Sequence, residues 1–187
     1  MNYPIVVGIS GASAPIFGIE TLRALRACAV ETHLVISRSA ERTIALETDM
    51  AFDDVCALAD CVHDATNIAA SVASGSFRTR GMIIAPCSMK TLSAVANSYS
   101  DNLLARAADV TLKERRRLVL MTRETPLHRG HLELMLRVTD MGGVIMPPVP
   151  AFYHRPQTIQ DLVRQSVGKA LDLFDIEHDL FNRWDGA

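Results

Sequence analysis

Small and hydroxyl residues follow apolar runs at several points of the chain, and these are the first candidates for a binding site. The earliest such segment, residues 8–18, follows the run 5–7 and places Ser13 among glycines and alanines. Small residues let a phosphate approach the backbone, and N–H groups at a helix start attract an anion. The segment is neither GxGxxG nor a lysine-containing phosphate loop, so a tight turn that binds nothing is the alternative.

Serine and threonine also follow two later apolar runs. Ser37 comes directly after residues 33–36, and Ser88 and Thr91 come shortly after residues 82–85. Such side chains either cap the next helix or donate hydrogen bonds to a ligand at its positive end. The sequence leaves both interpretations open. Glu47 follows an apolar helical stretch and is, by itself, typical of a solvated helix end.

Cations gather in the second half of the chain. Arg123 and Glu124 follow the run 118–121, which predicts a position at the ligand-binding edge of a parallel sheet and an anion-binding role for Arg123. For residues 115–117 we expect an ordinary solvated helix face. Seven cations fall within 24 residues: Arg106, Lys113, Arg115, Arg116, Arg117, Arg123 and Arg129.

Cysteine and histidine give no metal signal. The cysteines form no CxxC pair and have no histidine at zinc-ligand spacing. His128 and His131 lie three apart but lack a third ligand, so we expect no metal site. Cys87 lies beside a candidate site without an adjacent base, which argues against a nucleophile. The other three are expected to be small buried hydrophobes: Cys28, Cys56 and Cys61.

The elements that position these residues form an alternating β/α chain. Five apolar runs, residues 5–7, 33–36, 82–85, 118–121 and 144–146, are nearly continuous, as strands buried on both faces are. Residues 16–28, 127–141 and 159–174 have helical apolar spacing. We therefore predict a single Rossmann-like, three-layer α/β domain over residues 1–187, with a mainly parallel doubly wound sheet. We also predict a short sixth strand near residues 61–63. Pro86 should end the strand that begins at residue 82. Residues 60–80 and 147–156 should form loops.

Composition excludes several classes of protein. Of 187 residues, 49% are hydrophobic and 21% charged, and the net charge is −2. These values favour a folded core and disfavour both disorder and a nucleic-acid surface. Because no apolar run approaches the ~20 residues that span a bilayer and no secretory leader is legible, we expect no membrane partner and a cytoplasmic location.

Taken together, several ordered motifs resemble the UbiX-type flavin prenyltransferases, formerly described as aromatic-acid decarboxylase subunits. The resemblance covers almost the whole chain. Its motifs are residues 8–13 (GISGAS), 46–49 (LETD), 86–92 (PCSMKTL), 106–114 (RAADVTLKE), 123–127 (RETPL), 131–133 (HLE) and 151–153 (AFY).

The resemblance implies a reaction. In that family reduced FMN accepts a dimethylallyl group from dimethylallyl monophosphate, a fourth ring closes across flavin N5 and C6, and phosphate is released without a metal. The product, prenylated FMN, is the cofactor of a separate UbiD-type decarboxylase. The family assembles as homo-oligomers, dodecamers with the flavin site between subunits.

The resemblance also implies site residues. Catalytic roles fall on Glu47, Glu124, Lys113 and Tyr153. Prenyl-phosphate contacts fall on Arg106, Lys113, Glu124, Tyr153 and Lys169. The flavin contacts fall on Gly11, Ala12, Ser13, Ser37, Ser88, Thr91 and Arg123. Departing phosphate needs cations and donors, and a carboxylate can pass the proton that phosphate gains.

Three positions depart from the family pattern. Ala14, followed by Pro15, stands where the family usually has glycine, which implies a stiffer loop. Lys169 replaces a common arginine and loses its bidentate fork. Leu134 stands where asparagine is frequent.

Two other functions stay open. The related FMN-dependent cysteine decarboxylases share the fold, but their PxMNxxM-type segment is missing, since residues 146–150 hold no asparagine. A non-catalytic flavin carrier or decarboxylase partner is the third possibility. Retention of Lys113, Glu124 and Tyr153 argues against it, because carrying FMN alone would not require prenyl-phosphate contacts.

Overall fold

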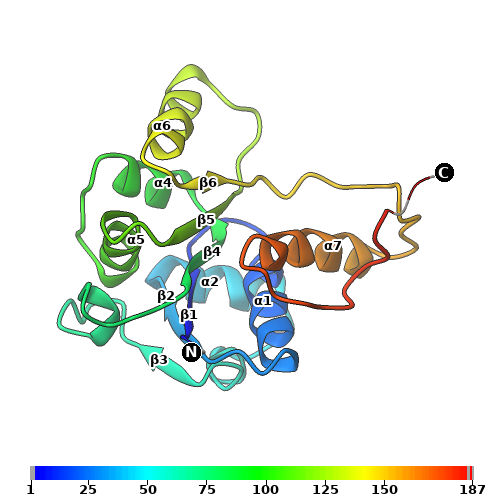
Figure 1. The fold of residues 1–187 in the computed structure, drawn as a ribbon, viewed down its shortest axis with the longest axis horizontal. Helices are drawn as coiled ribbons and strands as arrows, with labels where there is room; N and C mark the ends of the chain where they lie inside the picture. Colours follow the sequence, from blue (N-terminus) through cyan, green and yellow to red (C-terminus); the bar gives the residue numbers. More distant parts are fainter. Residues whose placement is uncertain (1–2, 185, 187) are drawn as a thin grey trace.

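Six parallel strands form one sheet in the order β3-β2-β1-β4-β5-β6 in the computed structural model, which describes residues 3–184 and 186 (Figure 1). All five predicted strands are confirmed, and so is the sixth near residues 61–63. The strands are β1 (Ile5–Ile9), β2 (Thr32–Ile36), β3 (Cys61–His63), β4 (Gly81–Cys87), β5 (Arg117–Thr122) and β6 (Val144–Ile145).

Helices cover both faces of the sheet. Helices α1 and α7 pack on one face with α2 and α3, and α4, α5 and the short 3-10 helix η1 cover the other (Figure 1). The three-layer, doubly wound prediction is thus confirmed. The helices are α1 (Ile16–Ala27), α2 (Arg38–Glu47), α3 (Phe52–Cys56), η1 (Ser71–Ala73), α4 (Met89–Ala96), α5 (Leu103–Lys113), α6 (Arg129–Asp140) and α7 (Ile159–Asp172).

The strands are apolar because their side chains meet a helical layer on each face. Every residue of β1, β2 and β4 is buried. The prediction that Pro86 ends its strand is wrong, since β4 continues to Cys87. A register shift between Ile84 and Cys87 lets the strand pass the missing N–H of proline.

Helix α6 begins and ends near its predicted limits but covers little of the sheet. Val138 is its one fully buried residue, and Leu132 and Leu136 are exposed. The helix packs on α4 and projects beyond the sheet (Figure 1). Part of the apolar stripe of α6 is therefore not covered by its own chain. Among the described helices, none has the length and apolarity to cross a membrane.

Gly18 fixes the distance between α1 and the sheet. A Cβ at this position would lie 2.3 Å from the carbonyl oxygen of Ala85 and 2.7 Å from the Ile9 side chain. We expect Gly18→Ala to lower the free energy of unfolding by about 1–3 kcal/mol, because overpacking outweighs the gain in helix propensity. Denaturant titration measures the change.

Gly130→Ala is the matched control, since there an added Cβ meets only the His128 side chain. It should stay within about 0.5 kcal/mol of the parent or gain slightly. Equal stabilities of the two variants would contradict the close-packing role of Gly18.

Candidate active site

The carboxyl ends of β1 and β4 lie side by side at the point where the strand order of the sheet reverses. The connections from these neighbouring strands leave toward opposite edges, and open α/β sheets bind ligands in the crevice this creates. Buried Ser10 ties the two ends together: its Oγ donates to the carbonyl of Pro86 at 2.9 Å and accepts from the Ser88 N–H at 2.7 Å. The sequence analysis missed this residue, which lies within the GISGAS motif.

The first loop binds a carboxylate of its own chain. Glu47 Oε2 accepts from Ser13 Oγ at 3.1 Å and from the Ala14 N–H at 2.7 Å. Glu47 is therefore part of the site rather than a free helix end. Its carboxylate occupies the anion position at the start of α1, so the geometry does not favour phosphate docking there.

Backbone geometry explains two small residues of this loop. A Cβ on Gly11 would lie 2.2 Å from Ser39 Oγ, so glycine allows the loop to approach the start of α2. Ala14 has a φ of 69°, in the left-handed region that favours glycine. Alanine at this position, where the family usually has glycine, therefore puts a Cβ on a strained backbone.

Ser37 and Ser88 both cap helices. Ser37 Oγ accepts from the Ala40 N–H at 3.2 Å at the start of α2, and Ser88 Oγ accepts from the Thr91 N–H at 3.3 Å at the start of α4. The capping interpretation is confirmed for both. Hydroxyl hydrogen bonds also join Ser37 to Ser39 and Ser88 to Thr91, each at 3.2 Å. All these oxygens lie at the carboxyl edge, where ligand contact stays a prediction.

Arg123 and Thr122 offer unpartnered polar groups at the end of β5. The Arg123 N–H donates to the carbonyl of Cys87 at 3.0 Å, while its guanidinium has no hydrogen bond or ion pair with any described residue. Thr122 Oγ1 is buried and equally unpartnered. Glu124 is exposed and accepts from the Thr125 N–H at 3.1 Å. Orphaned donors at this edge fit an anionic, hydrogen-bonding cofactor.

Cys87 lies behind this edge and is inert. It is fully buried, and burial raises the pKa of its thiol far above the usual value. A protonated, inaccessible thiol is no nucleophile. The other three cysteines, expected to be buried, are half-buried instead: Cys28, Cys56 and Cys61.

A cavity of about 590 Å³ opens at the same edge, between the starts of α2, α4 and α5. Its size suits a cofactor. Three cations line the cavity that were not predicted from the sequence: Arg38, Arg42 and Lys90. Arg38 directly follows the capping Ser37, and Lys90 lies two positions after the capping Ser88. The lining residues are Ser37, Arg38, Ser39, Arg42, Ala65, Thr66, Lys90, Asp101 and Asn102.

Arg106 and Lys113 lie elsewhere, on α5. Arg106 pairs with Asp109 at 2.9 Å and donates to the carbonyl of Ala73 at 3.2 Å. Lys113 pairs with Glu114 and thereby lowers the pKa of that carboxyl group. Lys113 precedes β5 and Glu124 follows it, so six residues at ~3.3 Å each hold them roughly 20 Å apart. One chain does not bring these two residues together.

Tyr153 and Lys169 form a third group on α7 and the preceding arm, residues 146–158. Tyr153 Oη accepts from Gln165 Nε2 at 3.2 Å, and Lys169 lies 3.4 Å from Asp172. A cavity of about 370 Å³ separates the arm from α7. Burial alone would raise the pKa of Asp172, but the hydrogen bond and charge of Arg183, then those of Lys169, outweigh it and lower the pKa.

Arg116 and His128 both hold neighbouring backbone in place. Arg116 is not on a solvated face: it is half-buried and donates to the carbonyls of Gly75 and Phe77, both at 2.7 Å, which ties down the segment after η1. His128 caps α6 by accepting from the Gly130 N–H at 3.0 Å, with the His131 ring beside it.

The crevice, its capped helix starts and its cations are the architecture of a mononucleotide-binding flavoprotein. A family model described as Flavoprotein matches residues 1–170. A curated flavin prenyltransferase UbiX from Thauera aromatica is 64% identical over 182 residues, covering 97% of this chain and 94% of the relative. The chain therefore belongs to the UbiX family of flavin prenyltransferases, which confirms the resemblance seen in its motifs.

Two solved structures are similar over their full length. A UbiX protein (PadA1) in complex with FMN and dimethylallyl pyrophosphate is 55% identical, with a TM-score of 0.98 and 100% of each chain covered. A dodecameric FMN-dependent UbiX-like decarboxylase from Escherichia coli O157:H7 is 50% identical, with a TM-score of 0.96 and coverage of 98% and 100%.

Proposed function

We propose that this protein joins a dimethylallyl group, from dimethylallyl monophosphate, to N5 and C6 of reduced FMN and releases phosphate. The observation that carries the proposal is the 55% identity and TM-score of 0.98 to a UbiX structure solved with FMN and dimethylallyl pyrophosphate. As the C–O bond to phosphate breaks and N5 forms its new bond, phosphate gains the proton that N5 loses. The ring closes when one alkene carbon takes up a proton, the other bonds C6, and C6 gives up its own proton.

In this proposal the flavin lies over the carboxyl edge of β1, β4 and β5. The unpartnered Arg123 guanidinium and the hydroxyls at the starts of α2 and α4 are available to hold it. Glu47, already joined to Ser13, lies where it can exchange a proton with the flavin. The flavin contacts are Gly11, Ala12, Ser13, Ser37, Ser88, Thr91 and Arg123.

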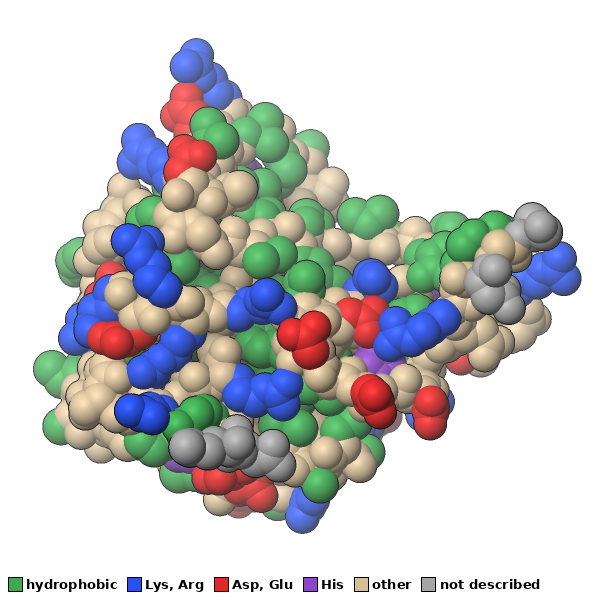
Figure 2. Space-filling model, viewed as in Figure 1, with side chains coloured by type: hydrophobic (Ala, Val, Ile, Leu, Met, Phe, Trp, Pro, Cys, Tyr) green, Lys and Arg blue, Asp and Glu red, His purple; other side chains and the backbone are tan. Residues whose placement is uncertain are grey.

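We further propose that the working site lies between subunits of a homododecamer. The separation of Lys113 from Glu124 supports this, since one phosphate cannot contact both within a chain. Exposed apolar side chains also suit subunit contacts; Figure 2 shows hydrophobic groups over the α6 projection. The large ones on α6 and on the arm are Leu132, Leu136, Val149 and Phe152. The Escherichia coli O157:H7 relative is dodecameric.

The product would serve a UbiD-type decarboxylase in the cytoplasm, with residues 1–187 acting as one flavoprotein domain. The family resemblance, in which prenylated FMN is the cofactor of a separate enzyme, supports this. All four cysteines are free thiols, which agrees with a reducing compartment.

Anaerobic incubation with reduced FMN and dimethylallyl monophosphate tests the proposal. We expect the protein to bind FMN, release phosphate, and yield a flavin heavier by one dimethylallyl group minus one hydrogen in mass spectrometry. Dimethylallyl pyrophosphate, run in parallel, identifies the preferred donor.

Each competing function predicts a different product. Bound but unmodified FMN would support a flavin carrier. Carbon dioxide released from a cysteine-terminated peptide, with FMN unmodified, would support a cysteine decarboxylase. Absence of any flavin spectral change or calorimetric heat at saturating FMN would refute flavin binding itself.

A further inference from the structure

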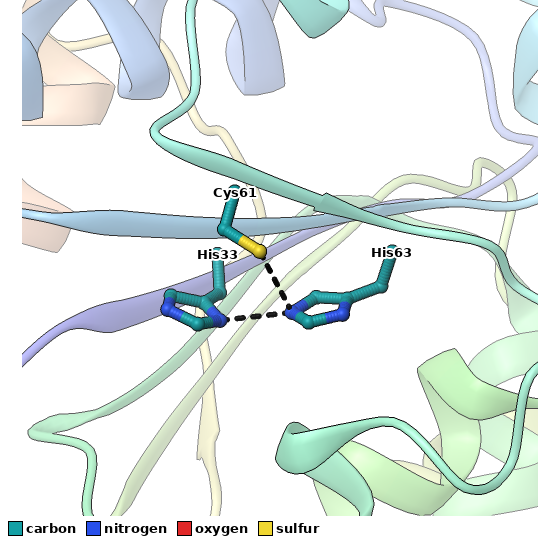
Figure 3. A group of neighbouring side chains, drawn as sticks. All are labelled: His33, Cys61 and His63. Atoms are coloured by element: carbon teal, nitrogen blue, oxygen red, sulfur yellow. Dashed lines mark hydrogen bonds between the residues drawn. The ribbon is translucent and has the colours of Figure 1, made fainter.

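Two histidines and a cysteine from the neighbouring strands β2 and β3 point toward one another at the edge of the sheet (Figure 3). His33 lies on β2, and Cys61 and His63 lie on the edge strand β3 (Figure 3). In the parallel register His33 is paired with Cys61, and Val35 with His63. Residues two apart on a strand share a face, so all three side chains project from the same side of the sheet.

The spacing of their ligand atoms is close to that of a metal site. His33 Nδ1 lies 2.8 Å from His63 Nε2, Cys61 Sγ lies 3.6 Å from His63 Nε2, and all three atoms lie within 4.8 Å of one another. A tetrahedral Zn²⁺ with bonds of ~2.0–2.1 Å to nitrogen and ~2.3 Å to sulfur separates N from N by about 3.3 Å and N from S by about 3.6 Å. The Cys61 Sγ–His63 Nε2 pair already fits, the two ring nitrogens need to part by about 0.5 Å, and Cys61 Sγ and His33 Nδ1, which lie within 4.8 Å, need to settle at about 3.6 Å.

The far side of His33 carries the partner that metal-binding histidines use. Its other ring nitrogen, Nε2, lies 3.4 Å from the carboxylate of Glu31. A carboxylate in this position fixes the tautomer in which Nδ1 presents a lone pair to a metal, and it makes the ring a stronger ligand. Glu31 is more than half exposed and can accept a hydrogen bond from the Nε2–H of His33 without being a ligand itself.

The surroundings hold the ligands in place and leave one side open. The His33 ring packs against Phe77, and Asp60 accepts hydrogen bonds from the Thr32 N–H and hydroxyl at 2.8 and 3.1 Å, which joins the starts of β2 and β3. His33 is nearly buried, whereas Cys61 and His63 are half-buried. Water can therefore reach the cluster and supply a fourth ligand.

We propose that His33, Cys61 and His63 form a Zn²⁺ site that joins the edge strand β3 to β2. Two imidazole nitrogens and a thiolate are ligands that zinc prefers. The site is structural: β3 has three residues and only one neighbouring strand, so a metal cross-link adds what short backbone pairing lacks.

Metal titration of the whole protein tests the site. Protein stripped with a chelator should bind one Zn²⁺ per chain in competition with a chromophoric chelator. Co²⁺ in its place should give thiolate-to-cobalt charge-transfer absorption. Zinc at ~100 times its dissociation constant should raise the midpoint of thermal unfolding by about 5–10 °C.

Variants separate the cluster from nonspecific binding. Cys61→Ser should weaken zinc binding at least about 100-fold, and Glu31→Gln, which leaves all three ligands, by about 10–100-fold. Cys56→Ser is the matched control, because Cys56 is also half-buried but lies outside the cluster. It should leave zinc affinity within about two-fold of the parent. Circular dichroism verifies that each variant is folded.

Alkylation gives a measurement that needs no variant. Zinc should protect Cys61 from iodoacetamide in the parent protein, mapped by mass spectrometry, while Cys56 reacts equally with and without the metal. Absence of binding, absence of a cobalt–thiolate band, or equal protection of both cysteines would each overturn the proposal. The cluster would then be a histidine pair held by a hydrogen bond.

Discussion

Glu124→Gln is expected to slow prenyl transfer by at least about two orders of magnitude, because a positioned proton donor contributes ~10²–10⁴-fold. FMN affinity should stay within a few-fold of the parent. The substitution keeps the shape of the side chain and its acceptor oxygen for the Thr125 N–H, so the loop after β5 should not move. The unpartnered Arg123 guanidinium, which we assign to the flavin, is untouched. Single-turnover transfer and FMN titration measure the two effects separately.

Glu177→Gln is the control for the change of charge, because Glu177 is exposed and lies near the C-terminal end of the fold, away from the crevice. Its transfer rate should match the parent. A parent-like rate in Glu124→Gln would show that the proton passes through another group, with Glu47 the first to examine. Loss of FMN affinity equal to the loss of rate would instead assign Glu124 to flavin binding.

Lys113→Leu is expected to raise the prenyl-phosphate concentration needed for half-saturation by about 10–100-fold, since a charge-assisted hydrogen bond to phosphate contributes ~1.5–3 kcal/mol. It should also slow transfer, because the same cation stabilises phosphate as it departs. FMN affinity should not change. Among the residues that the structure describes, Lys113 pairs with its neighbour Glu114 alone, so its loss should leave the fold intact, as a thermal melt would verify.

Mixing the two variants tests where the site is built. Suppose that Lys113 of one chain and Glu124 of another meet at one phosphate. When equal amounts of the two variants mix at random, about a quarter of the sites should then receive an intact Lys113 from one chain and an intact Glu124 from the other. Coexpressed Lys113→Leu and Glu124→Gln chains should then be far more active than either alone. No recovery in mixed oligomers, or a fully active monomer by light scattering, would contradict a site between subunits.

The parallel sheet could be predicted from the sequence because its strands are nearly continuous apolar runs. A strand covered on both faces must be largely apolar, and the residues of β1, β2, β4 and most of β5 are buried, with Thr32 and His33 of β2 as polar exceptions. The parallel order in turn predicted that Ser13, Ser37, Ser88 and Arg123 would share one edge, which the structure confirms. For the serines that begin α2 and α4, local side-chain chemistry left helix capping and ligand contact open, and the structure shows the caps.

Contacts between distant segments could not be predicted in this way. The local sequence around Glu47 is typical of a solvated helix end, and only the resemblance to the family places this residue in the site, because its partners, Ser13 and Ala14, lie more than thirty positions earlier. Arg116 was read as solvated because the carbonyls it binds belong to a segment with no periodic pattern. Pro86 was expected to end β4, but a register shift, invisible in sequence, lets the strand continue.

By itself, the sequence determined the family, the parallel sheet and which edge carries the polar residues, because apolar periodicity and ordered motifs are local properties of the chain. Only the tertiary structure decided that β2 pairs with β3 in the register that brings His33 to Cys61 and His63. That register is set by packing between segments far apart in the sequence. Residue spacing along the chain does not record that register.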